Sequence, residues 1–235
     1  MALFAVRVWV PDRPGALGLV ASRIGAVRGD LVGIDILERG GGRAIDELVV
    51  DLPDESLVGL LLSEMSEVDG VDVEDVRPAP GGVVDPRLDA LETAASLLTR
   101  TSVGPLLEHL ARSSLRDFGS DWAAIVQPAG PDRLPDHVVA DHVVAVGAAP
   151  AAPWIGAFLA GSRASVGPHG RDTGPDDIAW ADLDAAGLVL VLGRDGRPFR
   201  ARERRQLAVL TRIADRRWAE LVARPSRRMH PSRAG

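Results

Sequence analysis

The sequence predicts an α+β protein of two consecutive domains, each built around an antiparallel sheet. Three observations lead to this prediction. Residues 1–78 follow the order strand, helix, strand, strand, helix, strand. A proline- and glycine-rich stretch at 78–82 then interrupts the periodic pattern. Residues 1–80 carry a net charge of −8 and the remainder +2, a difference that favours two separate modules.

The elements of the first half follow from hydrophobic periodicity. Alternating apolar residues predict strands, and apolar residues at helical spacing predict helices. In chain order they are the strand 4–10, the helix 17–27, the strands 31–38 and 48–52, the helix 57–68 and the strand 71–76. The glycines at 40–42 predict a hairpin turn between the second and third strands. We expect a four-stranded antiparallel sheet with both helices on one face.

The second half is predicted by the same patterns to contain helices around a further sheet. In chain order its elements are the helices 88–98 and 103–115, the strands 121–126 and 137–146, a short helix at 154–159, the strand 188–192 and the helix 201–221. Loops are expected at 128–135 and 162–176, and disorder at 224–235. We therefore assign 1–78 to the first domain, 79–86 to a linker and 87–223 to the second domain.

The most informative motif is the segment 11–17, with the sequence PDRPGAL, which joins the first strand to the first helix. Pro14 fixes φ and removes a hydrogen-bond donor, and Gly15 permits close approach of another backbone. The unpaired N–H groups at such a helix start can hold a carboxylate. The motif is therefore a candidate site for a small anion or an amino acid.

This motif, the order of the elements and the glycine hairpin together resemble the ACT domain, a small ligand-binding regulatory module. The resemblance covers roughly residues 3–77 and implies a ferredoxin-like βαββαβ fold, a homodimer and an amino acid bound at its interface. In such a site, we expect Asp12 to receive the α-amino group and the amides of Gly15 to Leu17 to receive the carboxylate. The two walls of the implied site are Asp12, Arg13, Gly15, Ala16 and Leu17 of one protomer, and Leu31, Val32, Gly33 and Ile34 of the partner subunit.

The end of the chain resembles, more loosely, the way a GAF domain closes. The residues concerned are the strand 187–192, Pro198-Phe199 and the helix that carries Glu203, Leu207 and Leu210. The resemblance implies a GAF-like α/β domain with a central antiparallel sheet, opened by a helix at 89–101. There is no cysteine to attach a bilin and no cyclic-nucleotide signature, so no cofactor is expected.

Composition and spacing argue against catalysis. The absence of cysteine and lysine excludes disulfides, thiolate metal sites, Schiff bases and a phosphate-loop lysine. His137 and His142 are five residues apart on a predicted strand and so are expected on opposite faces, which argues against a shared metal and favours a structural or exposed role. Ser102, His109 and Asp117 lack the turn that exposes a nucleophilic serine. We expect neither a catalytic site nor a metal.

The last helix and tail are rich in arginine, with 13 arginines against 4 acidic residues over 194–235. A basic side formed by Arg204, Arg205, Arg212, Arg216 and Arg217 would suit nucleic acid or an acidic partner. No nucleic-acid-binding motif accompanies it and the whole chain carries −6, so a solvated face is favoured and nucleic acid is disfavoured.

We therefore expect a cytoplasmic, non-enzymatic regulatory protein with no membrane segment, which senses an amino acid through its first domain. Many ACT domains hold their ligand with an asparagine, and this chain has none. One alternative is accordingly a scaffold whose domains serve only in assembly. A second is an enzyme with convergent polar groups in a cleft of the second domain.

Overall fold

The computed structural model describes residues 2–79, 86–128, 141–164 and 175–223. The chain divides into two compact units, one of Met1–Asp89 with Phe199–Arg205 and the other of Ala90–Pro198 with Gln206–Gly235. The predicted linker, His137 and the predicted disordered tail lie wholly or largely outside the described residues. The domain boundaries at 78 and 87 therefore stay predictions.

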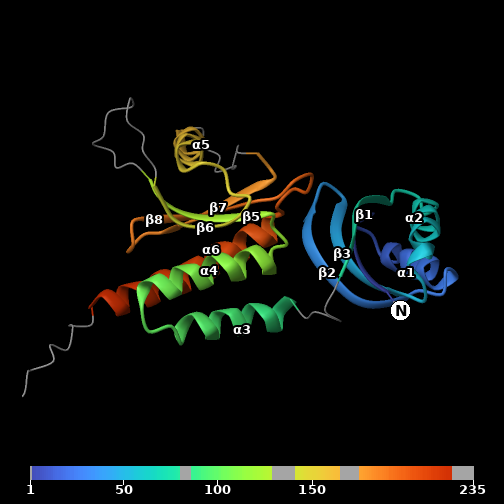
Figure 1. Cartoon of the computed structure of the whole chain (residues 1–235). Coiled ribbons are helices and arrows are strands. Elements are labelled where there is room, and N and C mark those ends of the chain that lie inside the picture. The colour runs from blue at the N-terminus through green and yellow to red at the C-terminus, as the bar shows by residue number, and fades with distance from the viewer. Residues whose placement is uncertain (1, 80–85, 129–140, 165–174, 224–235) are drawn as a thin grey trace, which may run out of the picture. The chain divides into compact units, whose positions relative to one another are not determined.

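The first unit has the βαββαβ order that the sequence predicts, and that prediction is confirmed. Its elements are β1 (Ala2–Pro11), α1 (Ala16–Ala26), β2 (Asp30–Gly40), β3 (Arg43–Leu52), the 3₁₀ turn η1 (Glu55–Leu57), α2 (Val58–Ser66) and β4 (Asp72–Pro78). The antiparallel sheet has the order β2-β3-β1-β4, so β1 is an inner strand and β2 is an edge strand. Both helices cover one face of this sheet (Figure 1).

The core of the first unit lies between that face and the two helices. Alternate residues of β1 and β3, including Val6, Val8 and Leu48, pack there in one cluster with Val20 of α1 and Leu61 of α2. Each of these five side chains is fully buried. Burying a side chain of this kind stabilises a fold by roughly 1.5–3 kcal/mol. Apolar residues that recur every two positions in the strands and every 3.6 positions in the helices thus account for the packing of this core.

The other face of the sheet carries a ladder of charged residues. Arg7 of β1 is 1% exposed and donates a hydrogen bond of 2.9 Å to Glu47, its neighbour in register on β3. Arg77 of β4 donates to the second oxygen of Glu47 at 3.0 Å and to Asp75 at 3.1 Å. Glu203, in the Phe199–Arg205 segment of the same unit, is a further partner of Arg7 at 3.3 Å. These carboxylates compensate a buried charge that would otherwise be strongly destabilising.

We predict that Glu47→Gln destabilises the first unit by about 3 kcal/mol at neutral pH, because it removes the charge that compensates Arg7. Burial raises the pKa of Glu47, but Arg77 and Arg7 lower it more, so the net pKa is below the ordinary 4.5. The stability that Glu47 contributes is therefore lost as pH falls below about 4.5 and through the folded-state pKa. Urea denaturation measures both effects. The exposed Glu67→Gln should change stability by less than about 0.5 kcal/mol, and equal losses in both variants would contradict the role of Glu47.

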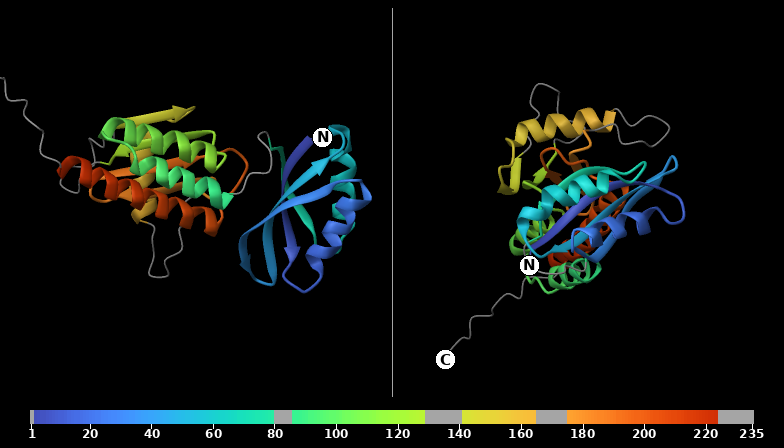
Figure 2. Two further views of the ribbon diagram at one scale, coloured as in Figure 1. Left: turned by 90° about the horizontal axis from the view of Figure 1, so that it is seen from below. Right: turned by 90° about the vertical axis from the view of Figure 1, so that its right-hand side faces the viewer.

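The remaining elements form a second sheet with helices on both of its faces. They are α3 (Pro86–Leu98), α4 (Val103–Asp117), β5 (Trp122–Gln127), β6 (Asp141–Gly147), α5 (Ala152–Ala164), β7 (Ile178–Leu183), β8 (Leu188–Gly193) and α6 (Ala201–Ala223). The sheet is antiparallel in the order β6-β5-β8-β7. Figures 1 and 2 show α5 on one face, and α4 with α6 on the other. The predicted central antiparallel sheet is confirmed.

Two features of the second unit differ from the prediction. Strand β7 was not expected, because residues 178–181 are all apolar and show no alternation of apolar and polar residues. Its pairing with β8 and the burial of Ile178 and Leu183 hold it in place. The loop predicted from Ser162 was wrong at its start, since α5 continues to Ala164. No glycine or proline at 162–164 breaks that helix.

Candidate functional site

The corner between β1 and α1 has a special backbone conformation, as its sequence suggests. Gly15 precedes the first residue of α1 and has a φ of +87°, in the left-handed region. A Cβ atom at this position would meet no heavy atom within 4 Å. The positive φ requires glycine at this position, and the close approach of another backbone stays a prediction.

Three N–H groups at this corner have no hydrogen-bond partner among the described residues. They belong to Gly15, Leu17 and Gly18, and no side chain caps the helix. Ala16 differs, because its N–H donates to the carbonyl of Arg13 at 3.3 Å. The predicted anion site therefore keeps the amides of Gly15 and Leu17, loses that of Ala16 and gains that of Gly18. Such groups, with the positive end of the helix dipole, favour an anion.

The charged residues of the corner lie at the surface. Asp12 donates its backbone N–H to the carbonyl of Gly42 at 2.9 Å, which ties the corner to the β2–β3 hairpin. Its carboxylate lies 4.0 Å from Nε of Arg39, with 42% of the Asp12 side chain exposed. Arg13 is exposed. Asp12 is thus open to a cationic group, with Arg39, a residue that the sequence did not single out, beside it.

The second predicted wall lies on the edge strand β2. Leu31, Val32 and Gly33 are half-buried, whereas Ile34 is 46% exposed. Ile36, two residues further, is 38% exposed on the same, helix-facing side. One side of β2 has no neighbouring strand in the sheet. The edge therefore presents two isoleucines next to unpaired backbone groups.

One chain does not bring the two predicted walls together. The register sets Leu31 opposite Val50 of β3 and Pro11 opposite Arg43 of β3. Val50 and Arg43 are separated along that strand by about 23 Å, from a rise of roughly 3.3 Å per residue. The corner and the start of β2 therefore lie at opposite ends of the sheet.

Asp46 of β3 is a candidate site residue that the sequence analysis missed. It is 3% exposed, lies on the helix-facing side opposite Val8, and makes no hydrogen bond or ion pair among the described residues. Burial raises its pKa; Arg39 opposes this shift, and Asp12 and Asp35 reinforce it. The available signal was the alternation of β3, because position 46 continues the buried series 48, 50 and 52.

We predict opposite effects for Gly15→Ala and Gly18→Ala, although a Cβ meets no atom within 4 Å at either position. Gly15→Ala should destabilise by about 1–2 kcal/mol, because it places a side chain on a left-handed residue. Gly18→Ala should stabilise by about 0.5–1 kcal/mol, because alanine favours the helix. Thermal denaturation measures both changes, and the same sign for both would contradict the backbone assignment.

A serine–histidine cluster between α3 and α4 does not have the geometry of a catalytic pair. Arg100 approaches Nδ1 of His109 at 3.3 Å, and since arginine only donates, Nδ1 is the acceptor and the proton lies on Nε2. Nε2 therefore donates to Ser96, with Ser113 at 3.3 Å. Ser96 in turn donates to the carbonyl of Thr93 at 3.2 Å. A histidine that donates to the serine cannot accept its proton, so Ser96 is not activated.

The serine, histidine and aspartate weighed in the sequence do not form a triad either. Ser102 precedes the first residue of α4, and Asp117 accepts a hydrogen bond from Thr93 at 2.7 Å. Within the described part of the chain, neither residue bonds to His109. The polar groups between α3 and α4 therefore serve helix packing.

His109 gives this packing a pH dependence. Burial lowers its pKa, Arg100 and Arg116 lower it further, and Asp117 opposes them, so the folded-state pKa is below the ordinary 6.5. The stability that the neutral His109 side chain contributes is fully present above pH 6.5 and is lost as pH falls through the folded-state pKa. We predict that His109→Gln, which keeps an N–H donor but does not titrate, loses less stability between pH 7 and pH 5 than the unaltered protein. Urea midpoints at both pH values measure this, and equal losses would contradict it.

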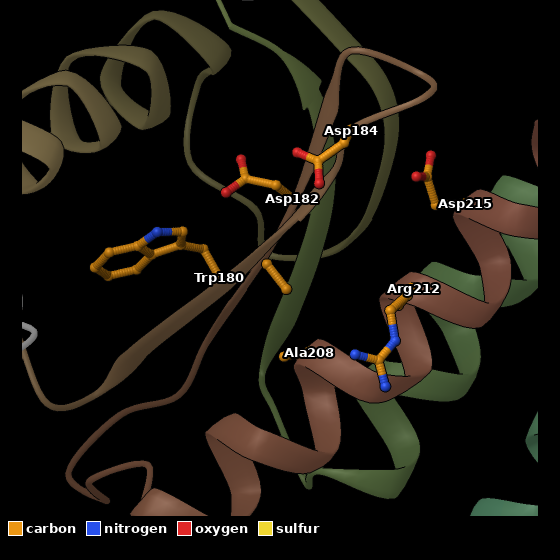
Figure 3. Close-up of a pocket in the computed structure, with 7 residues that line it drawn as sticks. Trp180, Asp182, Asp184, Ala208, Arg212 and Asp215 are labelled. Carbon is orange, nitrogen blue, oxygen red and sulfur yellow. The ribbon is translucent and has the colours of Figure 1, made fainter.

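A cavity of about 360 Å³ lies between β7 and α6 in the second unit. It is lined by Trp180, Ala181, Asp182, Asp184, Ala208, Arg212 and Asp215. Asp182 pairs with Arg163, and Asp215 accepts from the N–H groups of Ala185 and Ala186 at 3.0 and 3.1 Å. Figure 3 shows Arg212 pointing away from Asp182, so the charged groups do not converge on one point.

The basic side predicted for α6 is only partly formed. Arg217 is 8% exposed and donates to the carbonyl of Arg100 at 2.7 and 3.0 Å, so its inclusion in a solvated face was wrong. It lies on the same side of the helix as the buried Leu210 and Ala214. Arg205, Arg212 and Arg216 are exposed.

The described ranges lack both a candidate metal cluster and a candidate membrane helix. They hold no group of three or more histidine, aspartate or glutamate side chains arranged to bind a metal ion. Nor do they hold a helix with the length and apolar character needed to cross a membrane.

No protein-family model and no curated protein matches the chain. Among solved structures, it is similar to the ACT domain of a GTP pyrophosphokinase from Chlorobium tepidum, at 17% identity and a TM-score of 0.27 over 33% of this chain and 97% of that one. It is also similar to an uncharacterized protein from Thermotoga maritima at 22% identity, with a TM-score of 0.27 over 33% of this chain and 95% of that one. A third similar structure is a formyltetrahydrofolate deformylase from Pseudomonas putida, at 16% identity. Its TM-score is 0.27, over 38% of this chain and 36% of that one.

These similarities concern the fold alone. The βαββαβ assignment of the first unit rests on its own element order and strand pairing. The comparisons do not support a GAF-like second unit, and that assignment stays a prediction.

Proposed function

We propose that the first unit is a non-enzymatic regulatory domain that binds an amino acid between two copies of the chain. The observation that carries this proposal is the Gly15 corner, where three N–H groups at the start of α1 lack partners. The carboxylate of an amino acid suits these groups. Its ammonium suits the exposed carboxylate of Asp12, in a charge-assisted hydrogen bond.

The second copy is proposed because one chain supplies only one wall of the site. In an antiparallel pair of β2 strands, the start of one strand lies near the end of the other, so Leu31 and Ile34 of the partner subunit would approach the corner. The same pairing would satisfy the free edge of β2 and cover the exposed Ile34 and Ile36. A two-fold symmetric dimer of this kind contains two equivalent sites.

Regulation follows if the ligand prefers one arrangement of the two copies. A ligand shifts such an equilibrium only by the difference between its affinities for the two arrangements. A site whose walls come from both protomers supplies that difference, because a change in their relative position changes the contacts to the ligand.

We predict that at least one common L-amino acid raises the melting temperature of the full chain selectively in a thermal-shift screen. Asp12→Ala should weaken binding of that amino acid on the order of tenfold in calorimetry, the loss expected for one charge-assisted hydrogen bond. The control is Asp69→Ala, an exposed aspartate of the same unit, which should leave affinity unchanged. No shift with any of the twenty would contradict the sensor function.

A ligand-free scaffold is the second candidate function. The exposed isoleucines of β2 favour it, because covering them stabilises a dimer with or without a ligand. Sedimentation of the unliganded chain together with the screen separates the two: a dimer that no amino acid stabilises supports the scaffold.

A further inference from the structure

Asp46 is the one acidic residue beside the β1–α1 corner that is buried and lacks a partner among the described residues. A buried carboxylate without hydrogen bonds or a counter-ion is costly, and folded proteins almost always compensate such a group. Arg7, on the other face of the same sheet, illustrates the usual arrangement, with carboxylates in direct contact. The missing partner of Asp46 therefore calls for an explanation.

The position of Asp46 connects it to the corner. It lies opposite Val8 of β1 and Ile36 of β2, on the face that α1 covers. Asp12, the residue that begins the corner, and Arg39, which lies 4.0 Å from Asp12, both act on the Asp46 carboxylate through charge.

The charges around Asp46 are unbalanced in favour of a cation. Asp12 adds a second negative charge to that of Asp46, and Arg39 is the cation among the groups that act on it, whereas the charge of Asp35 is paired with Arg202. The corner amides provide a place for an anion on the same side of the unit. A ligand that carries both charges, with its cationic group toward the aspartates, complements both parts.

We propose that Asp46 receives the ammonium group of the bound ligand together with Asp12, and so makes the site selective for α-amino acids over α-hydroxy acids of the same shape. This inference rests on the proposed function of the first unit. The α-hydroxy acid keeps the carboxylate for the corner amides but leaves Asp46 without a counter-charge. Selectivity between the two therefore measures the role of Asp46 separately from binding itself.

The experiment compares Asp46→Asn with the unaltered chain by calorimetry. The probes are the L-α-amino acids that raise the melting temperature, each paired with its L-α-hydroxy acid counterpart, for example L-alanine with L-lactate. We expect the unaltered protein to prefer the amino acid at least tenfold, and Asp46→Asn to lose most of that preference. The control Asp51→Asn changes a carboxylate on the opposite face of the same strand and should keep the preference.

Each outcome has a distinct meaning. If amino acids bind and Asp46→Asn keeps the full preference, the role of Asp46 is overturned while the proposed function stands. If no amino acid binds the unaltered chain, the proposed function fails and the inference fails with it.

A separate readout is the melting temperature without ligand at pH 7. The melting temperature of Asp46→Asn should match or exceed that of the unaltered chain, because the substitution removes an uncompensated charge. A lower value would show a structural role instead.

Discussion

The left-handed backbone at Gly15 is the constraint on which the rest of the first unit depends. It turns the chain from the inner strand β1 directly into α1, which packs back over the sheet. Because no side chain caps the helix, the N–H groups of Gly15, Leu17 and Gly18 stay without partners. One backbone angle therefore positions the helix and also leaves N–H groups at the corner that suit an anion.

The two faces of the sheet treat buried charge in opposite ways. On one face, Arg7 is compensated by Glu47 and Glu203, an arrangement that stabilises the fold. On the other, Asp46 is buried and makes no direct hydrogen bond or ion pair in the described structure. A compensated charge serves structure, whereas a buried carboxylate with a raised pKa and no direct partner is a candidate functional group. This contrast separates the structural acidic residues of the unit from the candidate functional ones.

The sequence predicted the elements of the first unit well, because apolar periodicity decides them. It also located the corner, since few segments combine proline and glycine between a strand and a helix. It could not show that Ala16 already donates its N–H to Arg13, which depends on the shape of the turn. Asp46 was missed because a carboxylate on a buried strand face contradicts the pattern used to find the core. Strand β7 was missed because residues 178–181 are all apolar and give no apolar–polar alternation, and its pairing with β8 is a tertiary effect.

The account is tested most directly by following the backbone amide signals of the ¹⁵N-labelled chain during titration with the amino acids that raise its melting temperature. A carboxylate at the start of α1 should move the signals of Gly15, Leu17 and Gly18 by the largest amounts, at concentrations that match the calorimetric affinity, and leave Ala16 less affected. Saturating binding with these three signals unchanged would place the ligand elsewhere and contradict the account.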